Sequence, residues 1–261
     1  LISIVSLIII AYLSLTMEIR RDMMEKYLRL QASVFGDFKE IDLSQESMSM
    51  LYQIYLKENM MPTIMKEFDV LSQNVKNRPN FIANDNSISI SIASNRIDIT
   101  SDASAGDKML NKDRFLEVAI KYIKEFFEIF QVGISRMSYI EEGIIKIIDN
   151  PMEDKIKAKY INTEHIYNSN KIFEWSSNSV SLDEWDINGS TEKVNLNVTT
   201  ALRRISAQKD GQPVLLNALV LTQDLNTLAE NTALRLKADD VETFLNKAVQ
   251  KSVEITSITE G

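Results

Sequence analysis

Apolar residues recur with helical spacing along one long stretch of the chain, Asp113 to Tyr139. At the i, i+3, i+4 and i+7 spacing of one helix face lie Phe115, Val118, Ala119, Tyr122, Phe126 and Phe130. Lysine and glutamate residues fall largely on the other side, which is typical of a solvated face. The pattern predicts one long amphipathic helix, broken by Gly133 and followed at once by a strand, whose apolar face covers a sheet.

Serine and isoleucine alternate strictly from Ser87 to Ile92, which indicates a β-strand with isoleucine on one face. Residues that favour turns, Asn84–Asn86 and Ser94–Asn95, flank this segment. A three-stranded antiparallel meander is therefore predicted, with strands at Phe81–Ala83, Ser87–Ala93 and Arg96–Thr100. Its serine face is also a candidate for adding a strand from a partner.

Further elements are predicted on both sides of this central region. Towards the N-terminus we expect a strand at Leu28–Phe35 and a helix from Ser44 to about Lys57. Val132–Ile148 is strand-like and is interrupted at Glu141–Gly143.

The C-terminal part of the chain predicts a β-hairpin followed by a helix. Alternation over Thr191–Ser206 and an apolar run at Val214–Thr222 are joined by the turn Lys209–Gly211. Ala238–Ile258 then has a helical apolar face, with Asp239 as a candidate N-cap.

This order of elements predicts an α+β fold. Antiparallel sheets, a β-meander and a β-hairpin, would pack against the long central helix and the C-terminal helix. Residues 17–261 show no internal repeat or evident linker, so we expect a single domain with a polar insert at about 149–190.

Residues 1–16 form an almost wholly apolar segment. Three interpretations are open: a start placed too far upstream with Met17 as the true first residue, a short membrane anchor, or a buried strand or helix. A span needs roughly 20 apolar residues, so the run is slightly short for a transmembrane helix. We favour the misplaced start, and membrane association is expected only if residues 1–16 are a true anchor.

Composition excludes several kinds of chemistry. A formal net charge of −8 argues against a general nucleic-acid-binding surface. There is no cysteine and a single histidine, His165, so cysteine-based sites and multi-histidine metal sites cannot form within one chain. The seven glycines match no phosphate-binding loop. We therefore expect no cofactor and no metal.

Charged residues suggest two further sites. Asp149, Glu153 and Lys155 have the residue types of a carboxylate–lysine nuclease site that binds Mg²⁺. Pro151 would break the strand that such a site needs, so we expect a solvated loop there. Arg96, Arg136 and Arg203 are candidates for an anion site, with structural ion pairs as the alternative.

Aromatic residues in the polar insert are candidates for partner binding. Phe173, Trp175 and Trp185 lie in a stretch with little regular core to bury them. Exposed aromatic side chains are typical anchors of protein interfaces. The alternative is that the three rings pack the insert onto the domain.

Three segments carry a resemblance to a known family: Asn95–Ile99 (NRIDI), Arg136–Ile140 (RMSYI) and the closing strand and helix at Ala218–Glu254. From Met17 to the end, the chain resembles a sporadically distributed family of bacterial proteins of unknown function in the order and spacing of its elements. The resemblance implies a bacterial accessory protein, associated with a mobile-element or defence-type system.

Together these features predict a non-catalytic protein-interaction or accessory protein in the cytoplasm, which binds an unidentified protein partner. Two alternatives stay open. One is a metal-dependent nuclease or phosphodiesterase that uses Asp149 and Glu153, and the other is a membrane-anchored accessory protein with the same body.

Overall fold

The structure is a computed structural model that describes residues 27–69, 73–148, 174–209 and 212–260. Its elements, in chain order, are β1 (Tyr27–Gly36), α2 (Gln45–Tyr55), a 3-10 turn η1 (Leu56–Glu58), β2 (Met60–Asp69), β3 (Asn74–Ala83), β4 (Ser89–Ile92), β5 (Arg96–Asp102), a 3-10 segment η2 (Ala103–Lys108), α3 (Lys112–Phe130), β6 (Ile134–Ile148), β7 (Trp175–Ile187), β8 (Ser190–Lys209), β9 (Gln212–Thr227) and α5 (Ala238–Glu260).

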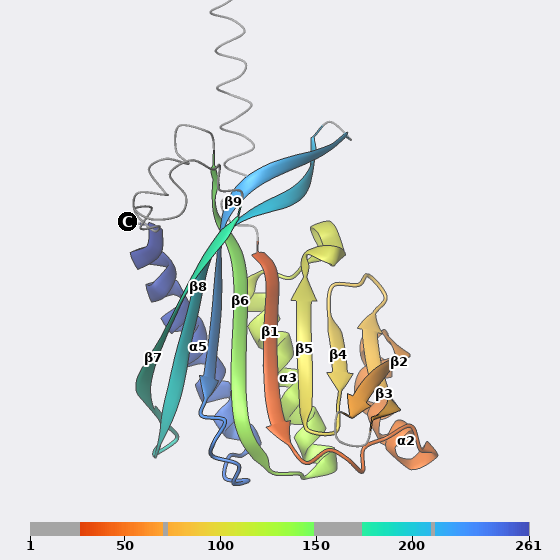
Figure 1. Ribbon diagram of the computed structural model, residues 1–261. Coiled ribbons are helices and arrows are strands. Elements are labelled where there is room, and N and C mark those ends of the chain that lie inside the picture. The colour runs from red at the N-terminus through yellow and green to blue at the C-terminus, as the bar shows by residue number, and fades with distance from the viewer. Residues whose placement is uncertain (1–26, 70–72, 149–173, 210–211, 261) are drawn as a thin grey trace, which may run out of the picture.

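The described strands form one nine-stranded antiparallel sheet, in the order β2-β3-β4-β5-β1-β6-β9-β8-β7 (Figure 1). The predicted α+β class with antiparallel strands is confirmed. The meander and the hairpin do not form separate sheets, because β1 pairs with β5 on one side and with β6 on the other. This pairing joins the N-terminal and C-terminal halves into one sheet.

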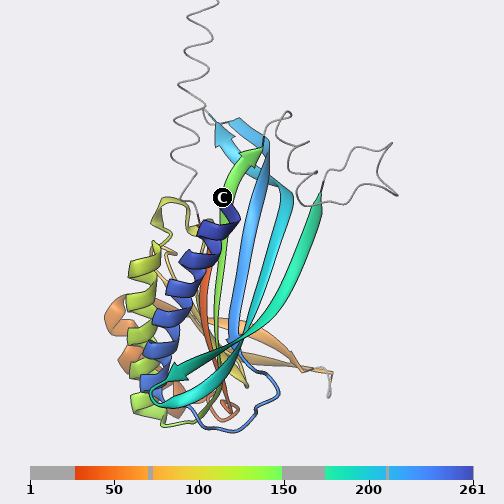
Figure 2. The ribbon, with the colours of Figure 1, turned by 90° about the vertical axis from the view of Figure 1, so that its left-hand side faces the viewer.

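The described helices cover one face of the sheet, and no described helix covers the other, which we call the open face (Figure 2). The apolar face of α3 is buried at Phe115, Ala119, Tyr122, Ile123, Phe126 and Phe127. In α5 the predicted face is also buried: Val241, Phe244, Leu245, Ala248 and Ser252. Phe126 lies at the centre of this core, stacked on Phe130 with ring centroids 4.6 Å apart and edge-on to Phe38 at 5.9 Å.

Helix α3 ends earlier than the apolar pattern suggests. Gln131 adopts the left-handed conformation (φ 50°) and its N–H bonds the Phe127 carbonyl at 3.0 Å, which closes the last turn. A Cβ at Gly133 would lie 2.8 Å from Leu234 Cβ, so glycine permits the close approach of the 234–236 segment there. The helix and strand β6 are thus separated at residues 131–133.

Three predicted elements need correction. The helix starting at Ser44 is followed by strand β2, an element absent from the prediction. Pro62 disfavours a central strand, but β2 is an edge strand, where proline is tolerated. Strand β6 continues through Glu141–Gly143, with register shifts at Tyr27/Arg29 and Phe35/Gly36 in its pairing with β1 and at Ile144/Lys146 in its pairing with β9. The stretch Trp175–Ile187, which the sequence predicts as an irregular part of the polar insert, is the regular strand β7.

The two halves of the sheet share one connectivity. Strand β1, the meander β3-β4-β5 and helix α3 are matched by strand β6, the meander β7-β8-β9 and helix α5. From the centre outward the orders are β1-β5-β4-β3 and β6-β9-β8-β7. In this correspondence β7 is the counterpart of β3. Strand β3 has β2 on its outer side, whereas no described strand flanks β7 there.

Across the part of the chain that the structure describes, no helix has both the length and the apolar character required to cross a membrane. The apolar segment 1–16 lies outside the described residues.

Candidate functional site

The open face of the sheet carries a row of polar side chains that crosses eight strands. Ser33 Oγ donates to Asp98 Oδ1 at 2.7 Å, and Ser138 Oγ donates to Asp224 Oδ1 at 3.0 Å. Asn226 Nδ2 also donates to Asp224, at 3.1 Å. In cross-strand register the row comprises Thr63, Asn80, Ser91, Asp98, Ser33, Ser138, Asn226 and Asn195. Hydrogen bonds join Thr63, Asn80 and Ser91 to one another and Ser33 to Asp98, so these polar groups have partners within the protein.

The three candidate arginines do not form one anion site. Arg96 and Arg136 both lie opposite Phe35, on strands β5 and β6, and the Arg136 guanidinium stacks on the Phe35 ring at 4.6 Å. Arg96 Nε pairs with Asp98 at 2.9 Å. Arg203 lies on β8 and pairs with Glu142 at 3.0 Å. Arg96 and Arg203 are thus already paired with carboxylates. This agrees with the alternative expectation, that these residues form structural ion pairs.

The two tryptophans have different surroundings. Trp185 is only 7% exposed, and its ring lies 5.5 Å from that of Phe244 on α5. Trp185 Nε1 donates to Asp183 Oδ2 at 3.1 Å, and this hydrogen bond lowers the pKa of the Asp183 carboxyl. The expectation that Trp185 is an exposed anchor is therefore wrong, because β7 carries it into the core.

Trp175 is half-buried at the other end of β7. It packs against a small apolar cluster of Ile148, Leu202 and Leu219. Phe173 lies outside the described residues, as do Asp149, Glu153 and His165. Among the described residues no group of three or more histidine, aspartate or glutamate side chains is arranged to hold a metal ion.

A buried charged cluster that sequence reasoning missed lies between α3, α5 and β6. Glu141 Oε2 accepts from Lys112 Nζ at 2.8 Å, Tyr139 Oη at 2.9 Å and Ser252 Oγ at 2.8 Å. Burial, together with the Glu141 charge, raises the pKa of Tyr139 well above its ordinary value, so the phenol stays neutral. A pocket of about 510 Å³ lies beside Lys112, but the ammonium is already engaged by Glu141. This arrangement is typical of a structural ion pair.

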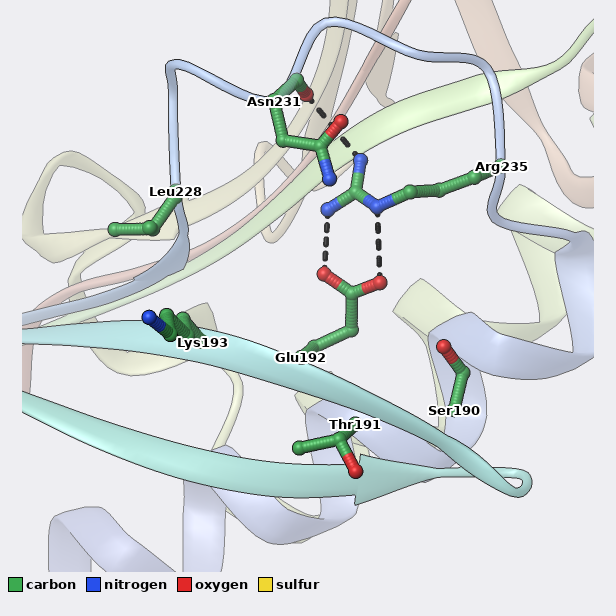
Figure 3. A pocket seen from close by; sticks show the side chains of 7 residues that line it. All are labelled: Ser190, Thr191, Glu192, Lys193, Leu228, Asn231 and Arg235. Carbon is green, nitrogen blue, oxygen red and sulfur yellow. Dashed lines mark hydrogen bonds and ion pairs between the residues drawn. The ribbon is translucent and has the colours of Figure 1, made fainter.

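A second pocket, of about 400 Å³, is lined in part by another internal ion pair, between Arg235 and Glu192 (Figure 3). Arg235 Nε and Nη2 bond the two oxygens of Glu192 at 2.9 and 2.5 Å. Arg235 Nη1 also donates to the backbone carbonyls of Ser135 and, at 3.2 Å, Asn231. The guanidinium thereby ties the loop before α5 to β6 and β8. Because its donors are used in this way, Arg235 is not a free cationic group; Lys193, which also lines the pocket, is exposed.

The outer edge of β7 is the least protected part of the described sheet. Residues 176–182 are all exposed, and residues 175–182 carry no charge and no proline. The pairing of β7 with β8 runs over Trp175–Ile187 without a register shift, so no bulge bends this edge away. Natural sheets usually protect such edges with charges, proline, bulges or a covering segment. A long and regular edge without these features is a surface that another strand can join.

The opposite edge strand, β2, has the usual protection. It contains Pro62, Lys66, Glu67 and Asp69. The serine-rich segment suggested for strand addition is β4, which lies between β3 and β5 and has no free edge. That suggestion is wrong for β4; among the described residues β2 and β7 are the edge strands, and β7 is the less protected of the two.

Comparisons with known proteins leave the family open. No protein-family model matches the chain, and no curated protein matches it. A solved structure of the rolling circle replication initiator protein from Geobacillus stearothermophilus is similar over 86% of this chain and 79% of that one, with 9% sequence identity and a TM-score of 0.30. This likeness is too low to bear on fold or function.

Proposed function

We propose that the protein is a non-catalytic accessory protein of the bacterial cytoplasm that binds a protein partner along the outer edge of β7. The single observation that carries this proposal is the regular, uncharged edge at residues 175–182, which is exposed over residues 176–182. The backbone N–H and C=O groups on such an edge supply the affinity when a partner strand is added.

The surroundings of β7 support a rigid binding edge. Thirteen residues of β7 pair with β8 in unbroken register. Asn188 Nδ2, in the turn that follows β7, donates to Asp240 Oδ1 at 2.8 Å and so ties the strand to α5. In this proposal α3 is the long central helix that supports the sheet, and the buried ion pairs of Lys112 and Arg235 are structural.

Site-specific photo-cross-linking tests the proposal. A benzophenone amino acid placed at Ser179, in the middle of the β7 edge, should give one discrete cross-linked product in cells of the native host. The same group placed at Lys76, an exposed residue of β3, is the matched control and should give no such product. Equal yields from both positions, or no product from Ser179, would contradict the proposal.

A further inference from the structure

The pocket between the start of β8 and the loop before α5 contains a hydrogen-bond donor of Arg235 that is not used. A guanidinium group has five N–H groups in a planar fork. Arg235 uses two of them on Glu192. Two more bond the backbone carbonyls of Ser135 and Asn231. The fifth, on Nη2, has no acceptor among the described residues, and the planar geometry of the group directs it away from Glu192.

Two further donors line the same pocket. Asn231 Oδ1 accepts from the Ala233 N–H at 3.4 Å, which leaves Nδ2 as the free end of this amide. Figure 3 shows the nitrogen directed toward the Arg235–Glu192 pair. Within the described part of the chain, neither Asn231 Nδ2 nor Lys193 Nζ has a hydrogen bond or an ion pair. The pocket therefore offers donors from three side chains that have no acceptor within the described protein.

We propose that this pocket, here called the Arg235 pocket, binds a small monocarboxylate whose oxygens accept from Arg235 Nη2, Asn231 Nδ2 and Lys193 Nζ. A carboxylate has two oxygens with about four lone-pair sites, so it can accept from all three donors. The site lies outside the edge at residues 175–182, and the inference does not depend on the proposed partner edge.

The charges of the lining favour a ligand with one negative charge. Arg235 and Lys193 contribute two positive charges and Glu192 one negative charge, so the net charge of the lining is +1. Glu192 is 6% exposed and is balanced by its bidentate pairing with Arg235, which leaves Lys193 as the uncompensated charge. A dianion such as phosphate would bring its second charge to the Glu192 carboxylate without a cation to offset it.

The size and the apolar wall of the pocket limit the rest of the ligand. Its volume of about 400 Å³ lies in the range of small-molecule sites, which is about 300–1,000 Å³. Leu228 lines the side opposite Arg235 (Figure 3). A short aliphatic group next to the carboxylate would cover this leucine. Such chemistry occurs both in a free aliphatic acid and at the C-terminus of a polypeptide.

The walls of the pocket are held in place by the protein itself. The Leu228 N–H donates to the Lys193 carbonyl at 3.2 Å, which fixes the two residues beside each other. Arg235 ties the loop to β6 and β8 through Ser135 and Glu192. A ligand therefore does not have to order this loop, and less of its interaction energy is lost on binding.

An NMR titration of the ¹⁵N-labelled full chain with N-acetyl-L-leucine tests the proposal. The signals of residues 190–193 and 228–235, including the side-chain amide of Asn231, should shift progressively. N-acetyl-L-leucinamide has the same shape without the negative charge and should bind about tenfold more weakly or less, because charge-assisted hydrogen bonds are lost. Equal binding of acid and amide, or no shifts at these residues, would overturn the proposal.

Variants locate the binding to the three donors. Asn231→Asp keeps an acceptor for the Ala233 N–H but replaces the free donor by a carboxylate, so binding should be lost. Lys193→Met removes the uncompensated charge at an exposed position and should weaken binding by about tenfold or more. Lys76→Met, the same change at an exposed position of β3, is the control and should leave binding unchanged. If Lys193→Met binds the acid as well as the unmodified chain does, the proposal is wrong, whatever Asn231→Asp does to the loop.

A second probe separates the two sources of the carboxylate. N-acetyl-glycyl-glycyl-L-leucine carries the same terminal group on a short peptide. Binding about tenfold tighter than that of N-acetyl-L-leucine supports the C-terminus of a polypeptide as the ligand, and equal or weaker binding supports a free acid. In both cases Lys193→Met should weaken binding of the two probes alike, and a loss confined to one probe would contradict a shared carboxylate site.

Discussion

Replacing Glu141 by alanine removes the acceptor at the centre of the buried charged cluster. One carboxylate oxygen accepts from Lys112, Tyr139 and Ser252 at 2.8, 2.9 and 2.8 Å. Glu141 is 4% exposed, and the Lys112 side chain is 12% exposed. Glu141→Ala therefore leaves an ammonium and a tyrosine hydroxyl largely buried without their acceptor.

The expected cost follows from this burial. Removing one partner of a buried ion pair typically destabilises a protein by about 3–5 kcal/mol, because the remaining charge is uncompensated. For a chain of this size each kcal/mol lowers Tm by about 2–4 °C, so the expected decrease is about 6–20 °C. Lys112→Met combined with Glu141→Leu should recover most of the loss, because apolar replacement of both charges is often neutral.

Urea and thermal unfolding, followed by circular dichroism, measure this prediction. The control is Glu117→Ala, which breaks the Arg114–Glu117 pair at 2.9 Å, where the side chains are 63% and 67% exposed. An exposed pair at nearly the same distance should contribute only about 0–1 kcal/mol. If Glu141→Ala costs no more than Glu117→Ala, the reasoning from burial is refuted.

Three further predictions concern the core. Phe126→Ala should lower the free energy of unfolding by about 3–5 kcal/mol. Adding Phe130→Ala should unfold the domain, because the total stability of a domain is typically about 5–15 kcal/mol. An unchanged Tm of the double variant would contradict this packing. Gly36→Ala should destabilise by about 1–3 kcal/mol in urea unfolding, because a Cβ there would lie 2.5 Å from the Gly133 carbonyl oxygen. Burial raises the pKa of Tyr122 to about 12, so the fold favours its neutral phenol; this stabilisation is complete below pH 10 and is lost as the pH rises towards 12. Tyr122→Phe should flatten the decrease in unfolding free energy over that range, and an equal slope in both proteins would argue against it.

The elements with a clear local period were predictable from the sequence. The alternation from Ser87 to Ile92 contains β4 (Ser89–Ile92), and Ile88, Ile90 and Ile92 are buried. The apolar face of Ala238–Ile258 corresponds to α5. Their periods follow from one buried and one solvated face, which sequence alone records. Ser44 also predicts the start of a helix, and its side chain caps α2 by accepting a hydrogen bond from the Ser47 N–H.

Strand β7 had no such signal. Its residues 176–182 are exposed on both faces, so apolar and polar positions do not have to alternate, and the segment looks irregular. Only pairing with β8 makes it a strand. The same segment is the proposed partner edge, so the exposure that concealed it from sequence analysis is also the feature on which the proposed function rests.

The sequence by itself therefore determined which segments can bury an apolar face, because that requirement acts over a few neighbouring residues. Tertiary structure alone decided which segments meet. Lys112 and Ser252 reach Glu141 from helices that are far apart in the chain, and Trp185 enters the core because α5 places Phe244 against it. Such contacts depend on how the strands pair and how the helices cross them, and no local pattern encodes a partner that is more than a hundred residues away.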